Sequence, residues 1–291
     1  MTGWVFLSLI IFLLFNCNYA IADDPVCDLS QAADAQLQSQ LENLLKREQL
    51  SAAVGHGELA LTLLVLSDPE KPRLAQVNGN RMMYAASLPK IVILLGAAVA
   101  IDEGRLQVDD GLLEDLHLMI RKSCNPCANR VIERVGEKQL LDIVQSPRFG
   151  FYDANDGGLW LGKQYGRKPA WRREPLRKLS HAATTFQTAR FYCGLQRSTL
   201  VSPEQNQLML DTLSDPGIDH KFVKGLKSQE NIEVFRKSGT WKSYHADSAL
   251  VRSGDDVYVI VGLTKHPDGG AWLQRLASPM HALAIAKHDP D

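Results

Sequence analysis

Ser87 and Lys90 lie three residues apart, directly before an apolar run that extends to Ala98. Pro89, between them, is tolerated in a first helical turn, and a run that is apolar on every side predicts a buried helix. Residues three apart share a helix face, so the hydroxyl and the ammonium are expected to point into the same space. Burial lowers the pKa of a lysine, and a neutral amine beside a hydroxyl makes a nucleophile with its own base.

A structural interpretation competes with this one, because Ser87 could cap a core helix while Lys90 reaches out to water. A Ser-x-x-Lys pattern is expected by chance about once in a chain of this length. Two further motifs change the balance: Ser123-Cys124-Asn125 and, on a predicted strand, Lys237-Ser238-Gly239-Thr240. Taken singly, these also have structural explanations as helix caps, an edge-strand charge and a close backbone approach.

The three motifs in this order resemble those of the penicilloyl-serine transferase superfamily, and most closely those of class A β-lactamases. The segments 101–106 and 247–251 are also similar to that family's helix ending and to its strand after the third motif. The resemblance covers most of the chain after residue 22. It implies an exported serine hydrolase that acts through an acyl-enzyme on a β-lactam or a peptidoglycan-like amide.

The resemblance also implies a role for each motif residue. Ser87 would be the acylated nucleophile, Lys90 would take its proton, and Ser123 would pass a proton to the leaving nitrogen beside Lys237. The backbone N–H groups of Ser87 and Thr240 would form the oxyanion hole, where one donor is worth about 2.7–4 kcal/mol of barrier. The residues that would bind substrate are Asn125, Ser238, Gly239 and Thr240.

Two departures from the family pattern bear on the reaction. Cys124 stands where the family has Asp, and Glu174 lacks the Leu-Asn that follows the family's deacylation base. Because Arg172 and Arg173 directly precede Glu174, an exposed ion pair is expected there. Without a positioned base, acylation could proceed while deacylation stays slow. The alternatives are therefore a D,D-peptidase-like penicillin-binding protein with a long-lived acyl-enzyme, or a non-catalytic scaffold of the same fold.

The apolar patterning predicts an α+β fold. Strands are expected at 58–66 and 73–77 and again at 234–240, 247–252 and 257–263. Helices are expected at 37–45, 89–104, 186–195 and 271–286, and the pattern over 112–141 is largely helical. Strands at both ends of the chain predict one antiparallel sheet with a mostly helical insertion, roughly residues 92–225, and a cleft between the two parts. The stretch 147–173 is expected to be a long shaped loop.

Composition and the N-terminus limit the partners. The 291 residues carry a net charge of -1 and no basic stripe, which argues against nucleic acid. Residues 1–22 read as a signal peptide with an apolar run too short to span a bilayer, so residues 23–291 are expected to form one catalytic domain in the periplasm or outside the cell. Lipid attachment at Cys17 is a less favoured alternative.

The remaining four cysteines, Cys27, Cys124, Cys127 and Cys193, suggest disulfides in an exported chain. Three pairings are possible, and the sequence does not select one. No second close cysteine pair and no paired histidines complete a zinc set, so no metal site and no cofactor is expected.

Overall fold

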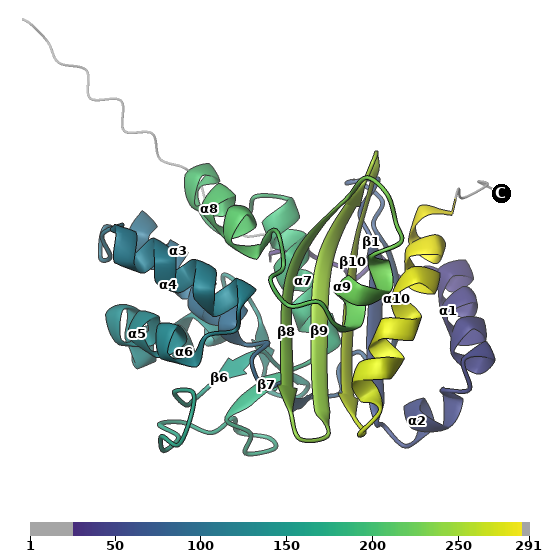
Figure 1. Ribbon diagram of the computed structural model, residues 1–291, viewed down its shortest axis with the longest axis horizontal. Coiled ribbons are helices and arrows are strands. Elements are labelled where there is room, and N and C mark those ends of the chain that lie inside the picture. Colours follow the sequence, from purple (N-terminus) through teal and green to yellow (C-terminus); the bar gives the residue numbers. More distant parts are fainter. Residues whose placement is uncertain (1–25, 287–291) are drawn as a thin grey trace, which may run out of the picture.

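A computed structural model describes residues 26–286 (Figure 1). Its main feature is a five-stranded antiparallel sheet with the order β2-β1-β10-β9-β8. The strands are β1 (Leu59–Val65), β2 (Arg73–Val77), β8 (Ile232–Trp241), β9 (Tyr244–Ser253) and β10 (Asp256–Lys265). Strands from both ends of the chain thus pair in one sheet, which confirms the predicted α+β fold. The predicted signal peptide lies outside the described residues.

Helices cover both faces of this sheet (Figure 1). The helices α1 (Ala35–Arg47) and α10 (Gly269–Ile285) pack on one face, and α7 (Thr185–Gln196) packs on the other. For this reason every residue of β1 is buried, and its sequence is apolar throughout except for Thr62. The predicted amphipathic helix at the N-terminal end is confirmed as α1, which begins where the Asp34 carboxylate accepts the Leu37 N–H.

The second part of the molecule is built around α3 (Lys90–Asp102), whose residues from Lys90 to Ala100 are all buried. The helices that surround it are α4 (Asp110–Arg121), α5 (Asn125–Val135), α6 (Glu137–Gln145) and α8 (Pro203–Leu213). A buried helix was predicted here, but α3 begins at Lys90, so Ser87 lies in the turn before it. The stretch 112–141, predicted to be largely helical, forms parts of three helices, because the chain breaks at 122–124 and at Gly136, which has a φ of +99°.

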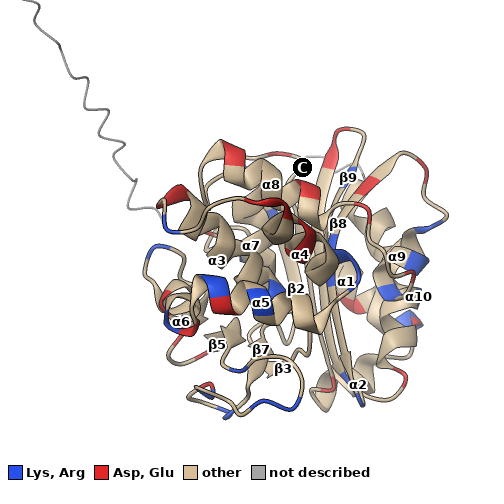
Figure 2. Ribbon diagram, turned by 60° about the vertical axis from the view of Figure 1, so that its left-hand side comes forward, with Lys and Arg blue, Asp and Glu red and all other residues tan. Residues whose placement is uncertain are grey.

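The long loop predicted at 147–173 contains three short strands, β4 (Tyr152–Asp153), β5 (Gly157–Gly158) and β6 (Trp160–Leu161). A small sheet of order β3-β7-β6 joins this loop to β3 (Met83–Tyr84), just before Ser87, through β7 (His181–Ala183). Through this sheet the loop is held against the Ser87 turn. Figure 2 shows Lys and Arg spaced along the connection from β6 to β7.

Two disulfides settle the pairing that the sequence left open. Cys27 bonds to Cys193, and Cys124 bonds to Cys127. The first joins residues 166 positions apart and is buried, whereas the second closes a loop of only three positions. None of the helices between residues 26 and 286 has the length and apolar character needed to cross a membrane. The short helices α2 (Ser51–Gly55) and α9 (Lys221–Leu226) complete the fold.

Candidate active site

Ser87 lies at a tight turn between β3 and α3. Ala86 has a φ of +51°, and the Leu88 N–H donates to the Ala85 carbonyl, which closes the turn. Ser87 is half-buried, and within residues 26–286 its backbone N–H has no hydrogen-bond acceptor. The turn therefore presents both a hydroxyl and a free backbone donor.

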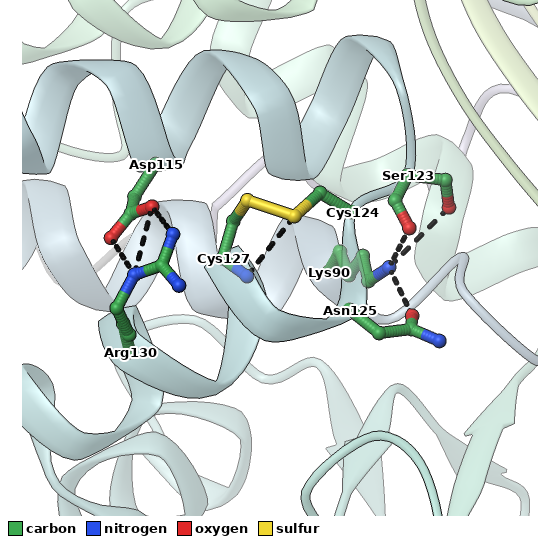
Figure 3. Close-up of a disulfide and its surroundings, with 7 residues drawn as sticks. All are labelled: Lys90, Asp115, Ser123, Cys124, Asn125, Cys127 and Arg130. Carbon is green, nitrogen blue, oxygen red and sulfur yellow. Dashed lines mark hydrogen bonds and ion pairs between the residues drawn. A yellow bond between two sulfur atoms is a disulfide. The ribbon is translucent and has the colours of Figure 1, made fainter.

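Lys90 connects this turn to the second motif (Figure 3). Its side chain is completely buried, and Nζ donates to the Ser123 carbonyl at 2.7 Å, to Ser123 Oγ at 3.4 Å and to Asn125 Oδ1 at 2.8 Å. Burial lowers the pKa of Lys90 to about 7, because the charged form loses its hydration. At neutral pH a substantial fraction of this amine is therefore uncharged and able to accept a proton.

Lys237 on β8 approaches Ser123, the serine that also contacts Lys90. Its Nζ donates to Ser123 Oγ at 3.1 Å and to the Ser238 carbonyl at 2.8 Å. Burial, and next the positive charge of Lys90, hold the pKa of Lys237 well below its usual range. Among the described residues neither amine has a carboxylate partner, since the nearby Asp247 is paired with Arg236. Ser123 Oγ thus lies between two amines that lose protons easily.

Gly239 brings β8 against the Ser87 turn. A Cβ atom at this position would lie 2.2 Å from the Ala85 carbonyl oxygen and 2.7 Å from the Ser87 nitrogen, so only glycine permits this approach. The Ser87 hydroxyl itself makes no hydrogen bond to Lys90 or Ser123 in the described part of the chain. Its place beside the other motifs is set by this backbone contact and by its own turn.

The start of α9 supports the end of β8 through His220 and Lys221. Lys221 Nζ donates to the Gly239 carbonyl at 2.7 Å and to Thr240 Oγ1 at 2.8 Å. His220 Nε2 lies 3.2 Å from Ser238 Oγ, and burial lowers the pKa of His220 to about 4, which leaves its ring neutral at pH 7. Neither residue was singled out from the sequence, because the region before α9 carries no motif.

The structure therefore brings the three predicted motifs together, with Ser123 in contact with Lys90 and Lys237 and with Gly239 against Ser87. Two hollows on the surface lie away from this cluster. One is lined by residues that include Asp68 and Asp256, and the other by residues that include Asp211. In the region from residue 26 to 286, no group of three or more His, Cys, Asp and Glu side chains is placed to hold a metal ion.

The model of the Beta-lactamase enzyme family matches residues 36–115 and 111–286. The chain belongs to this family. The resemblance inferred from the three motifs is thereby confirmed. No curated protein matches the chain.

Several solved structures have the same fold. A β-lactamase from Sphaerobacter thermophilus is 20% identical, with 83% of this chain and 99% of that chain covered and a TM-score of 0.65. PBP-A is also 20% identical, with 88% and 98% covered and a TM-score of 0.66. A mutant of PBP-A, seen as an acyl-enzyme complex with penicillin G, is 20% identical, with 91% and 100% covered and a TM-score of 0.66.

The loop between β6 and β7 holds Glu174 in a way that the sequence did not predict. The carboxylate is completely buried, accepts hydrogen bonds from Tyr152 Oη at 2.7 Å and the Arg177 N–H at 2.7 Å, and contacts the Leu176 N–H. The expected exposed ion pair with the preceding arginines is therefore wrong. Both oxygens are occupied by the loop itself, so this carboxylate stabilises the loop's own turn.

Tyr165, from the same loop, lies over Lys90. Lys90 Nζ is 4.4 Å from the centre of the Tyr165 ring. Asn129 fixes the backbone of Tyr165 on both sides, because its Oδ1 accepts the Tyr165 N–H at 2.8 Å and its Nδ2 donates to the Tyr165 carbonyl at 3.0 Å. Tyr165 Oη is buried without a hydrogen-bond partner among the described residues. Sequence reasoning missed this contact, since the loop has no period that places one residue over α3.

Proposed function

We propose that this protein is an exported serine hydrolase of the β-lactamase type that forms an acyl-enzyme at Ser87. The observation that carries the proposal is the position of Ser123 Oγ between the Nζ atoms of Lys90 and Lys237, at 3.4 and 3.1 Å. Such an arrangement provides both a proton acceptor and a route for the proton. The substrate is a β-lactam or a peptidoglycan-like amide.

In the proposed reaction, Ser87 Oγ attacks the carbonyl carbon of the amide and Lys90 accepts the hydroxyl proton. Ser123 delivers a proton to the leaving nitrogen and is recharged from the neighbouring lysines. The N–H groups of Ser87 and Thr240 stabilise the oxyanion. Lys221 donates to the carbonyl of the Gly239–Thr240 peptide, and this bond polarises the N–H of the same peptide.

Substrate is proposed to be held by the residues that border these groups. Asn125 Oδ1 is bonded to Lys90, which leaves its amide nitrogen to bind the substrate carbonyl. Ser238 and Thr240, on either side of Gly239, would receive a substrate carboxylate. The cations along the loop from β6 to β7 add a positive field that favours an anionic substrate (Figure 2).

A second candidate, a penicillin-binding protein with slow deacylation, is favoured by Tyr165. Hydrolysis of the ester needs a base that activates water. The aromatic ring of Tyr165 lies over Lys90, and burial raises the pKa of Tyr165 well above its usual range, so its hydroxyl stays protonated and does not serve as that base. Glu174 is turned toward Tyr152. The acyl-enzyme is therefore proposed to persist.

Incubation with a reporter penicillin, followed by intact-mass spectrometry, tests both candidates. We expect a penicilloyl adduct on the wild type and none on Ser87→Ala. The lifetime of the adduct separates the candidates, because rapid loss indicates a hydrolase and persistence indicates a penicillin-binding protein. An equal adduct on Ser87→Ala, or neither an adduct nor penicillin hydrolysis by the wild type, would leave only a non-catalytic scaffold.

Glu174→Gln is expected to leave both acylation and deacylation unchanged, because the carboxylate is engaged with its own loop. It should lower the free energy of unfolding by about 1–3 kcal/mol, since the new amide group faces backbone donors. Stopped-flow labelling and urea unfolding check the two parts. A fall in deacylation of a hundredfold or more would show that Glu174 is the base after all.

A further inference from the structure

The Cys124–Cys127 disulfide joins the central residue of the second motif to a residue two positions beyond it (Figure 3). It begins between the two residues that bind Lys90: Ser123 precedes Cys124 and Asn125 follows it. Both contacts to Lys90 Nζ, at 2.7 Å from the Ser123 carbonyl and 2.8 Å from Asn125 Oδ1, depend on the backbone of this short segment. Its conformation therefore sets the geometry of the proposed proton relay.

The disulfide stands in the place of a helix cap. Cys124 is the N-cap of α5, and its Sγ accepts the Cys127 N–H at 3.1 Å. Most helices use the oxygen of Ser, Thr, Asp or Asn at this position, whereas sulfur is a weak acceptor. Here the covalent bond joins the same two residues that a capping hydrogen bond would join.

Ser123 is held in a strained conformation by this segment. It is the one residue between the C-cap of α4, Lys122, and the N-cap of α5, and its φ is +57°. A non-glycine residue persists in the left-handed region only where its surroundings fix it. The Cys124 N–H is anchored to the Leu118 carbonyl at 3.1 Å, and the disulfide fixes the Cys124 side chain.

We propose that the Cys124–Cys127 disulfide positions Ser123 and Asn125 on Lys90, so that acylation of Ser87 depends on the redox state of this pair. The inference rests on the proposed function. A dithiol supplies the two electrons and two protons: the Sγ–Sγ bond breaks, each cysteine becomes a thiol, and the dithiol closes to its own disulfide. Ser123 is then free to leave the left-handed conformation.

The two disulfides differ in how a reductant reaches them. Cys127 is only 2% exposed, but Cys124 is half-buried and its neighbours Asn125 and Pro126 are exposed, so a reductant can reach the Cys124 side of this bond. Cys27 and Cys193 are only 4% and 0% exposed. A dithiol is therefore expected to open the pair in the second motif first. The helix itself should survive, because the buried side chains of α5 and the ion pair of Arg130 with Asp115 hold it to α4 (Figure 3).

The test compares oxidised wild type with protein treated with increasing dithiothreitol. Thiols are counted by iodoacetamide alkylation and mass spectrometry, and labelling by a reporter penicillin is timed on a parallel sample. We expect opening of one disulfide, with two alkylated cysteines mapped to 124 and 127, to slow labelling about a hundredfold, the usual effect of displacing a reacting group by about 1 Å. Far-UV circular dichroism should stay unchanged, and reoxidation should restore the rate.

Cys124→Ala/Cys127→Ala is the matched variant, and it should label at the slow rate with or without dithiothreitol. Unchanged labelling after selective reduction would overturn the inference, as would reduction of both disulfides at the same reductant concentration. Absence of both an adduct and penicillin hydrolysis with the oxidised wild type would instead refute the proposed function. The reduced wild type keeps the test decisive if the double variant fails to fold.

Discussion

Lys90→Met should lower the rate of acylation by a reporter penicillin by about 10²–10⁴-fold, the range typical for loss of a general base. Methionine fills nearly the same volume but cannot take the Ser87 proton or bond to Ser123 and Asn125. The rate is measured by stopped-flow or by quenched mass spectrometry.

Lys138→Met is the control for loss of a lysine, because Lys138 lies on the surface in an ion pair with Asp142 and contacts none of the site residues. It should acylate at the wild-type rate. If Lys90→Met labels as fast as the wild type, Lys90 is not the base.

The Lys90 amine also predicts how the acylation rate depends on pH. Only the neutral amine accepts a proton, and burial lowers the pKa of Lys90 to about 7. In the wild type the acylation rate should therefore rise about tenfold per pH unit below 7 and level off above it. A rate that is flat between pH 5.5 and 7 would contradict this assignment.

Asp247→Ala should lower the free energy of unfolding by about 3–5 kcal/mol, the usual cost of leaving a buried charge without its partner. Asp247 is completely buried, and its oxygens accept from Arg236 Nε at 2.6 Å and Nη2 at 2.9 Å. The Phe222 N–H donates to the same carboxylate at 3.0 Å, which ties α9 to the sheet. Removing the carboxylate leaves all these donors unsatisfied.

Urea unfolding of Asp247→Ala and of Asp142→Ala provides the comparison. The exposed pair of Asp142 with Lys138 is worth only about 0.3–0.5 kcal/mol. A loss below 1 kcal/mol in Asp247→Ala would mean that the Arg236 charge finds another partner or reaches water.

The sheet and the three motifs could be predicted from the sequence because each has a local signal. The apolar runs around Val65 and Val259 mark strands, and the even apolarity after Pro89 marks a buried helix. Convergence of the motifs could be anticipated only from their resemblance to a known family, since no local pattern fixes contacts between residues 114 positions apart, such as Ser123 and Lys237.

Other features had weaker signals or none. The apolar pattern over 112–141 does not mark where α4 ends, whereas the helix-cap interpretation of Ser123 and Asn125 did indicate the start of α5. The position of Tyr165 over Lys90 and the burial of Glu174 depend on how the loop folds back on the helices. Side-chain contacts of this kind are set by tertiary packing and leave no period in the sequence.

The central claim is that Ser87 carries the acyl group, and peptide mapping tests it most directly. After brief exposure to penicillin and digestion with trypsin, the peptide 82–90 contains two hydroxyl side chains, Tyr84 and Ser87. We predict that tandem mass spectrometry places the penicilloyl mass on Ser87. An unmodified peptide, or an adduct on Tyr84 or elsewhere in the chain, would contradict the account.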